Sequence, residues 1–224
     1  IADALTGRPL TSQEQVDQIL CDLDGTGDKS RLGANAVVGV SMVVARLFAA
    51  AAEQPLWRWL TPQGSTARLP VPHFNVVNGG AHALNGLDFQ EFMIAPLGAP
   101  SLSEAVRAGA EVYRQLRSLL ADRGLATGLG DEGGFAPEID SPEEVLAIMT
   151  KAITDAGYRP GRDGVAIALD PAASGFHREG SYVVGGEALS SADMVDRYVS
   201  IVENYPVWSI EDGMGEYDTA GWQK

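Results

Sequence analysis

Short apolar runs alternate with longer segments of helical spacing through most of the chain. Strands are predicted at four runs rich in β-branched and aromatic residues: 74–77, 92–95, 165–169 and 207–210. Helices are predicted at residues 102–120 and 142–156, each of which opens on a serine cap, and from Ser191 onward. A small hairpin is expected at residues 176–184. The order strand–strand–helix–helix–strand–helix–strand predicts an α/β fold without regular alternation at its start.

The first sixty residues have a helical pattern only. A capping box at residues 11–14 precedes a short amphipathic helix. Residues 35–53 are alanine-rich and apolar on most sides, so we expect this helix to be buried on most sides. The polar run at residues 61–66 indicates a linker. We therefore expect a helical domain over residues 1–68 and an α/β domain over residues 69–224.

Polar residues cluster where the predicted strands begin and end. The glycine-rich segment after residue 77 contains His82, and Glu91 stands just before the second strand. Glu132 lies in a second glycine-rich loop, and two later strands finish on Asp170 and Glu211. Acids at the ends of apolar strands are how a barrel-like α/β enzyme places metal ligands. Taken singly, each has an ordinary alternative as a turn residue or a solvated strand end.

Composition narrows the class of partner. Sixteen Lys and Arg against thirty Asp and Glu give a net charge of −14, which argues against nucleic acid or an anionic membrane as the primary partner. Clustered carboxylates suit divalent cations. The single cysteine, Cys21, excludes an internal disulfide. Ser41 and Arg46 interrupt the longest apolar stretch, so we expect no membrane span and a cytoplasmic protein.

Several separated motifs carry a family resemblance. NVVNGGAHA, DFQEFMIAP, GDEGGFAP, LDPAAS and SIEDG occur in the order and approximate spacing seen in enolases, and LDGTGDKSRLGANAVVGV resembles the enolase segment ahead of the barrel. The resemblance covers essentially the whole chain. It implies part of an α+β N-terminal domain followed by the first half of an enolase-type, TIM-like barrel. It also implies that the chain lacks parts of the whole enzyme and is inactive alone. The whole enzyme is expected to be a homodimer that acts in glycolysis.

The resemblance assigns a role to each candidate residue. It implies a Mg²⁺-dependent lyase that dehydrates 2-phosphoglycerate to phosphoenolpyruvate. Asp170 and Glu211 would be metal ligands, with a third aspartate, a lysine base and the phosphate-gripping residues elsewhere. Glu132 would be the general acid, assisted by Glu91. A mobile loop would carry His82 over the substrate, and Gln90 would belong to the same hydrogen-bonded set.

Two departures from the family pattern leave an alternative open. Pro171 follows Asp170 where a small non-proline residue is usual, and Gly175 stands where a glutamate is usual. Proline biases Asp170 toward extended geometry, which suits a strand end, so ligation is expected to survive. The alternative is a catalytically weakened enolase-like paralogue kept for binding or assembly.

Overall fold

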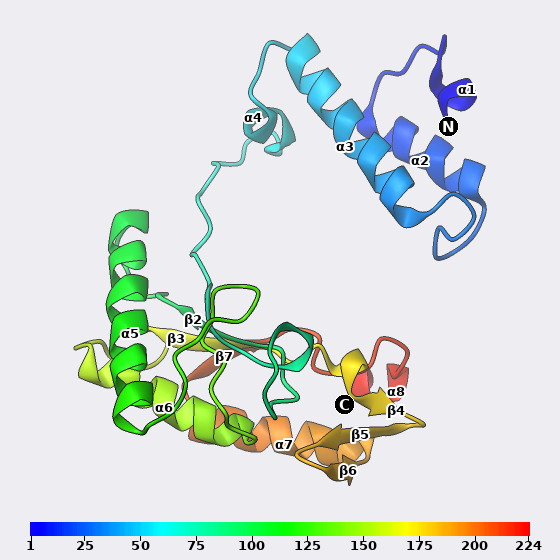
Figure 1. Cartoon of the computed structure of the whole chain (residues 1–224). Helices are drawn as coiled ribbons and strands as arrows, with labels where there is room; N and C mark the ends of the chain where they lie inside the picture. Colours follow the sequence, from blue (N-terminus) through cyan, green and yellow to red (C-terminus); the bar gives the residue numbers. More distant parts are fainter. The chain divides into compact units, whose positions relative to one another are not determined.

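A computed structural model describes residues 1–224, which divide into two compact units, Ile1–Leu69 and Pro70–Lys224 (Figure 1). The first unit is entirely helical. Its helices are α1 (Ala2–Leu5), α2 (Gln13–Asp24), α3 (Ala34–Ala51) and α4 (Leu56–Leu60). Ser12 caps α2 by accepting a hydrogen bond from the Gln15 amide, and Gly25 ends it in the left-handed conformation. A small core of Val16, Leu20 and Val37 joins α2 to α3.

Helix α3 corrects one expectation, because it is not buried on most sides within its own unit. Only 22% of the residues along it are buried, and its outer face exposes Val38, Met42, Val43 and Leu47. The reason is that the first unit offers only α2 and α4 as neighbours for its length. By length and composition alone, α3 could cross a membrane. Core helices of soluble proteins meet the same criterion, so the observation is weak evidence for a span.

The second unit is built on a four-stranded sheet in the order β1-β2-β3-β7. The strands are β1 (Phe74–Asn78), β2 (Glu91–Ala95), β3 (Ala166–Asp170) and β7 (Val207–Ile210). Strand β2 runs antiparallel to both β1 and β3, whereas β3 and β7 are parallel. The sheet is open at β1 and at β7, as expected for part of a barrel whose closed form has eight strands.

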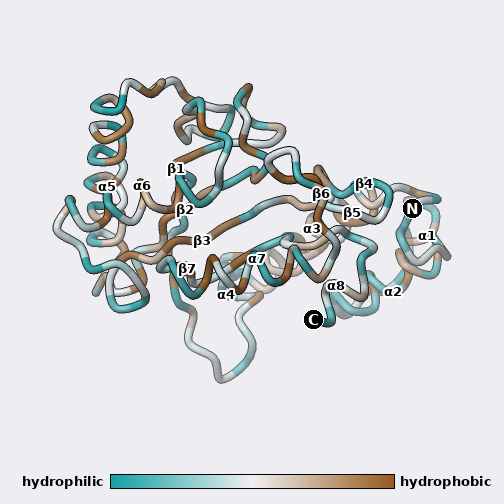
Figure 2. Tube along the Cα trace, turned by 90° about the horizontal axis from the view of Figure 1, so that it is seen from below, coloured by the Kyte–Doolittle hydropathy of each residue, from teal (hydrophilic) through white to brown (hydrophobic).

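Three long helices cover one face of this sheet: α5 (Leu102–Asp122), α6 (Pro142–Asp155) and α7 (Ser191–Asn204) (Figure 1). Serine side chains cap all three amino termini. The hydrophobic residues concentrate along the strands and the helix faces that meet them (Figure 2). In β2, Phe92 and Ile94 point into this core with no exposed surface, so Glu91 and Met93 lie on the other face. That other face carries the polar groups.

The segment after β3 is more elaborate than the expected hairpin. A short helix, η2 (Ala173–Gly175), leads into a three-stranded sheet of β4 (His177–Arg178), β5 (Ser181–Val184) and β6 (Glu187–Leu189). His177 lies in β4 and stacks on Tyr182 at 4.4 Å between ring centroids. A final short helix, α8 (Thr219–Gln223), follows β7.

Candidate active site

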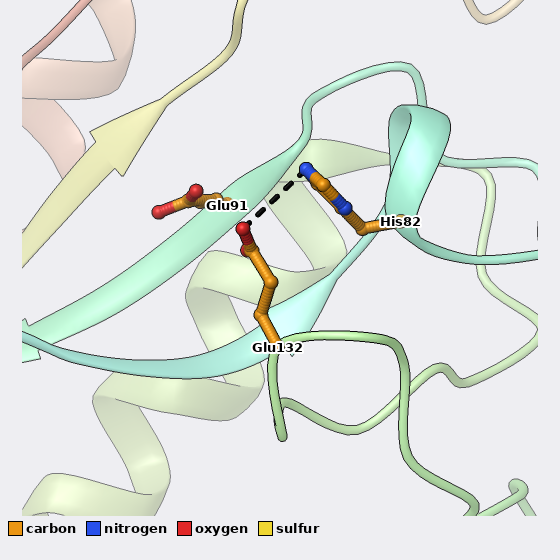
Figure 3. Close-up of side chains that lie close together, drawn as sticks. All are labelled: His82, Glu91 and Glu132. Atoms are coloured by element: carbon orange, nitrogen blue, oxygen red, sulfur yellow. Dashed lines mark ion pairs between the residues drawn. The ribbon is translucent and has the colours of Figure 1, made fainter. Parts of the chain in front are cut away.

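Three side chains from separate segments converge beside the sheet (Figure 3). His82 ends a short helix, η1 (Gly80–His82), Glu91 begins β2, and Glu132 comes from the loop that precedes α6. One ligand atom from each of the three lies within 4.8 Å of the others. His82 Nε2 and Glu132 Oε1 are 3.4 Å apart, and these side chains are 29% and 34% exposed. The group is therefore half-open to solvent.

Two asparagines of β1 hold the Glu132 carboxylate in place. Asn75 Nδ2 donates to Glu132 Oε2 at 2.7 Å, and Asn78 Nδ2 donates to the same oxygen at 3.3 Å. Asn78 is completely buried, and its Oδ1 accepts from the Gly134 amide at 2.9 Å. The asparagines thus occupy Oε2 and leave Oε1 facing His82. Neither was predicted as a site residue, although two amides in an otherwise apolar strand are a visible signal.

Close packing shapes the loop that carries Glu132. A Cβ at Gly134 would lie 2.7 Å from Asn78 Oδ1, so a side chain there would displace the asparagine. From the helical layer, Tyr113 of α5 donates its hydroxyl to the Gly133 carbonyl at 2.8 Å and stacks on Phe135. The acid loop is therefore fixed both by the sheet and by a helix.

The connection from β1 to β2, residues 79–90, is tied to itself by its backbone. The Gly79 amide donates to the Gln90 carbonyl at 2.9 Å, and the Gly80 amide donates to the Leu87 carbonyl at 2.7 Å. Only glycine fits at position 79, because a Cβ would lie 2.4 Å from the Phe89 carbonyl oxygen. These contacts bring His82 back toward the edge of the sheet where Glu91 lies.

Asp170 and Glu211 lie at the same edge. Asp170 is the last residue of β3 and pairs directly with Glu91 in the β2–β3 register. Its Oδ1 accepts from the Ala172 amide at 2.9 Å. Glu211 directly follows β7, and its amide donates to the Leu169 carbonyl at 2.8 Å. Burial raises the pKa of Asp170, and the negative charges of Glu211, Asp212 and Glu132 add to that rise.

Gln90 is placed differently from the other candidates. Adjacent residues of an extended segment point to opposite sides, so its side chain does not share the direction of Glu91. Gln90 lines a cavity of about 450 Å³ together with Pro171, Ala172 and Gly175. A Cβ at Gly175 would meet no atom within 4 Å, so the space that a larger side chain would fill is open.

Comparison with known families agrees with this architecture. Residues 66–224 match the family model described as "Enolase, C-terminal TIM barrel domain", and residues 1–60 match "Enolase, N-terminal domain". The chain belongs to the enolase family. Membership confirms the expected α/β fold with a partial barrel, to which the open sheet corresponds. It also indicates an enolase-type lyase in general terms.

In this enolase-family site, one carboxyl group has a strongly altered proton affinity. Burial raises the pKa of Glu91 to about 7, and the charge and hydrogen bonding of Glu132 and the charge of Asp170 contribute further. The nearby His82 partly opposes this rise. A carboxyl group with this pKa is half protonated near neutral pH. Glu91 can therefore hold a proton next to the Glu132 carboxylate.

The raised pKa of Glu91 predicts a pH dependence of stability. The folded chain holds this proton more tightly than the unfolded chain, whose Glu91 titrates near the ordinary value of 4.5. Stability therefore falls as the pH rises from 4.5 to about 7, and Glu91→Gln should flatten this part of the profile. Asp170 contributes in the same direction, so the slope should decrease rather than vanish.

Urea unfolding of the unsubstituted chain and of the Glu91→Gln variant, at several pH values from 4.5 to about 7, measures how the free energy of unfolding depends on pH. Glu187→Gln is the matched control, because Glu187 lies exposed in β6. An identical pH profile for Glu91→Gln and the parent would contradict the assignment.

Proposed function

We propose that this chain provides the acid half of an enolase active site, which dehydrates 2-phosphoglycerate to phosphoenolpyruvate. The observation that carries the proposal is the convergence of His82, Glu91 and Glu132 beside Asp170. Loss of a β-hydroxyl group requires a proton donor, since hydroxide leaves poorly unless it is protonated. A crowded pair of carboxyl groups, one with a pKa of about 7, meets that requirement.

The remaining acids fit a magnesium ion. Asp170 and Glu211 offer only oxygen donors, which Mg²⁺ prefers, and they come from neighbouring parallel strands. The pKa of Asp170 is raised partly by the charge of Glu211, a repulsion that a bound cation would relieve. When bound, Mg²⁺ would supply positive charge to the substrate carboxylate as the neighbouring carbon loses its proton. These donors make Asp170 and Glu211 the proposed ligands.

The roles of the chain's own residues follow from their hydrogen bonds. Asn75 and Asn78 fix Glu132 Oε2, so the proton for the leaving group is presented from Oε1 or from Glu91 beside it. As the carbon–oxygen bond breaks, that proton joins the departing hydroxide to give water. His82, at the end of η1, would cover the substrate and exclude water.

The base for the other half of the reaction is not assigned to these residues. Lys151 is the only lysine in the middle of the second unit, and it lies on α6 in an ion pair with Asp155. The lysine base implied by the family resemblance is therefore proposed to come from other barrel strands. Turnover by the 224-residue chain alone is not expected.

The second candidate function is that of a catalytically weakened enolase-like paralogue that is kept for binding. It is favoured by Gly175, because this glycine leaves open the cavity wall beside Pro171 where family members usually carry a glutamate. The two candidates differ in metal binding and turnover, so the same experiment separates them.

Calorimetric titration of the chain with Mg²⁺ tests the proposed ligands. Asp170→Asn and Glu211→Gln should each weaken binding at least about tenfold, because each removes one of two charged oxygen donors. Asp163→Asn is the control, since Asp163 is 82% exposed and precedes β3, whereas Asp170 is the last residue of that strand. Unchanged affinity in both ligand variants would refute the metal assignment. Mg²⁺ binding without phosphoenolpyruvate formation by the enzyme that contains this chain would favour the binding-only relative.

A further inference from the structure

The cavity of about 450 Å³ beside the acids has two walls that are far apart in the sequence. The loop between β1 and β2 forms the first wall with side chains from residues 80–90, and the segment after β3 forms the second with residues 171–176. The first wall leads directly into Glu91, and the second follows directly on Asp170. The distance between the walls therefore bears on any molecule that reaches these acids.

One side chain of the first wall is connected to the second through the small sheet. Asp88 Oδ2 accepts a hydrogen bond from the Gly185 amide at 2.7 Å, across 97 residues of sequence. Gly185 belongs to the turn between β5 and β6. In β5, the Val183 amide donates to the carbonyl of Phe176, a residue of the second wall, at 3.0 Å. Asp88 thus reaches the opposite wall through one hairpin.

The turn between β5 and β6 is suited to offer this amide. Val184 pairs with Glu187, so Gly185 and Gly186 form a two-residue turn, and their φ angles are 60° and 81°. Positive φ at both central positions is typical of type I′ turns, in which the hydrogen bond across the turn joins the two flanking residues. The amide of the first central residue is then available to an outside acceptor. A carboxylate such as Asp88 makes a strong one.

The next residue of the loop supplies an apolar contact between the same walls. Phe89 is completely buried and stacks on Phe176, with 5.9 Å between ring centroids and 13° between ring planes. Apolar packing is not directional, whereas a hydrogen bond fixes both distance and angle. The stack therefore holds the walls together, and the half-buried Asp88 adds a directional contact to the hairpin.

We infer that Asp88 is a positioning residue for substrate binding, which sets the separation of the two walls by holding the β5–β6 turn against the loop. The substrate named here, 2-phosphoglycerate, rests on the proposed function. The acids have supports of their own, because Asn75 and Asn78 hold Glu132 and β2 carries Glu91. Loss of the Asp88 contact should therefore weaken substrate binding without slowing the chemical step.

Amide hydrogen exchange of the 224-residue chain, followed by NMR, tests the contact without any reaction. In Asp88→Ala the exposed Gly185 amide loses its acceptor, so its exchange should become at least about tenfold faster. The Val183 amide should follow by at least about twofold. Asp88→Asn keeps an acceptor oxygen and should change both rates less than about threefold. Gly180, in the turn between β4 and β5, provides the reference amide, whose rate should stay constant.

Steady-state kinetics of the enzyme that contains this chain tests the positioning role. Asp88→Ala should raise the KM for 2-phosphoglycerate at least about threefold and change kcat less than about twofold. Asp88→Asn should restore the KM to within about twofold. Glu187→Ala is the matched control, because it removes an exposed carboxylate from the same hairpin on the far side of the turn.

Three results would overturn the inference. Unchanged exchange at Gly185 in Asp88→Ala would show that the hydrogen bond does not hold the turn. Faster exchange with an unchanged KM would show that the contact does not position the substrate, and a fall in kcat alone would place Asp88 in the chemical step. Absence of phosphoenolpyruvate formation by the unsubstituted enzyme would instead refute the proposed function, and the exchange rates would still decide whether Asp88 holds the hairpin.

Discussion

Replacing Glu132 by glutamine in the enzyme that contains this chain is expected to lower phosphoenolpyruvate formation by about 10²–10⁴-fold, the usual contribution of a general acid. Glutamine keeps the size of the side chain, and its carbonyl oxygen can still accept from Asn75 and Asn78, but its amide has no acidic proton to transfer. In the proposed mechanism, proton abstraction from the α-carbon does not use Glu132. Exchange of the α-proton with deuterium should therefore persist.

Proton exchange followed by NMR, beside an ultraviolet assay of phosphoenolpyruvate, separates the two half-reactions. Glu138→Gln is the matched control, because Glu138 lies exposed in the same loop and should leave both rates unchanged. Equal loss of exchange and dehydration in Glu132→Gln would mean that Glu132 does not act specifically on the leaving group.

Replacing Phe89 by alanine should destabilise the chain by about 3–5 kcal/mol, the usual cost of removing a fully buried aromatic side chain. Phe89 has no exposed surface, although it belongs to the loop that carries His82. Its ring lies 6.1 Å from Phe92 and 5.9 Å from both Phe176 and Tyr198, measured between centroids. The substitution therefore removes contacts to β2, to the segment after η2 and to α7 at once.

Urea unfolding of the chain measures this effect. Leu84→Ala is an internal control from the same loop, since Leu84 is fully exposed and should change the stability by less than about 0.5 kcal/mol. A loss below about 1 kcal/mol for Phe89→Ala would show that the loop is not anchored through this ring.

The sheet and its helices could be predicted because each has a strong local signal. The apolar runs at 92–95 and 165–169 nearly coincide with β2 and β3, and the serine caps at Ser101 and Ser141 mark where α5 and α6 begin. The burial of α3 was predicted wrongly, since an apolar composition does not say which neighbours a helix finds. The small sheet after η2 was seen only as a hairpin, because β4 and β6 are too short for a clear alternation.

The candidate site was only partly visible in the sequence. His82 and Glu132 were singled out by their glycine-rich surroundings and Glu91 by its place before the second predicted strand, and the fold brings all three together. Their catalytic roles stay predictions. The amides that hold Glu132 were missed because Asn75 and Glu132 are 57 residues apart and meet only through folding. The pairing of Glu91 with Asp170 likewise depends on the β2–β3 register, which no local pattern reveals.

The antiparallel direction of β2 restricts how the segment between residues 79 and 90 can evolve. Asn78 ends β1, Glu91 begins β2, and the register sets these two residues opposite each other, so both ends of the segment are anchored at one edge of the sheet. An inserted or deleted residue would shift His82 relative to Glu91. The turn at Glu179 and Gly180, exposed between β4 and β5, carries no such constraint. Among relatives of this chain, differences in length are therefore expected at that turn and not between the first two strands.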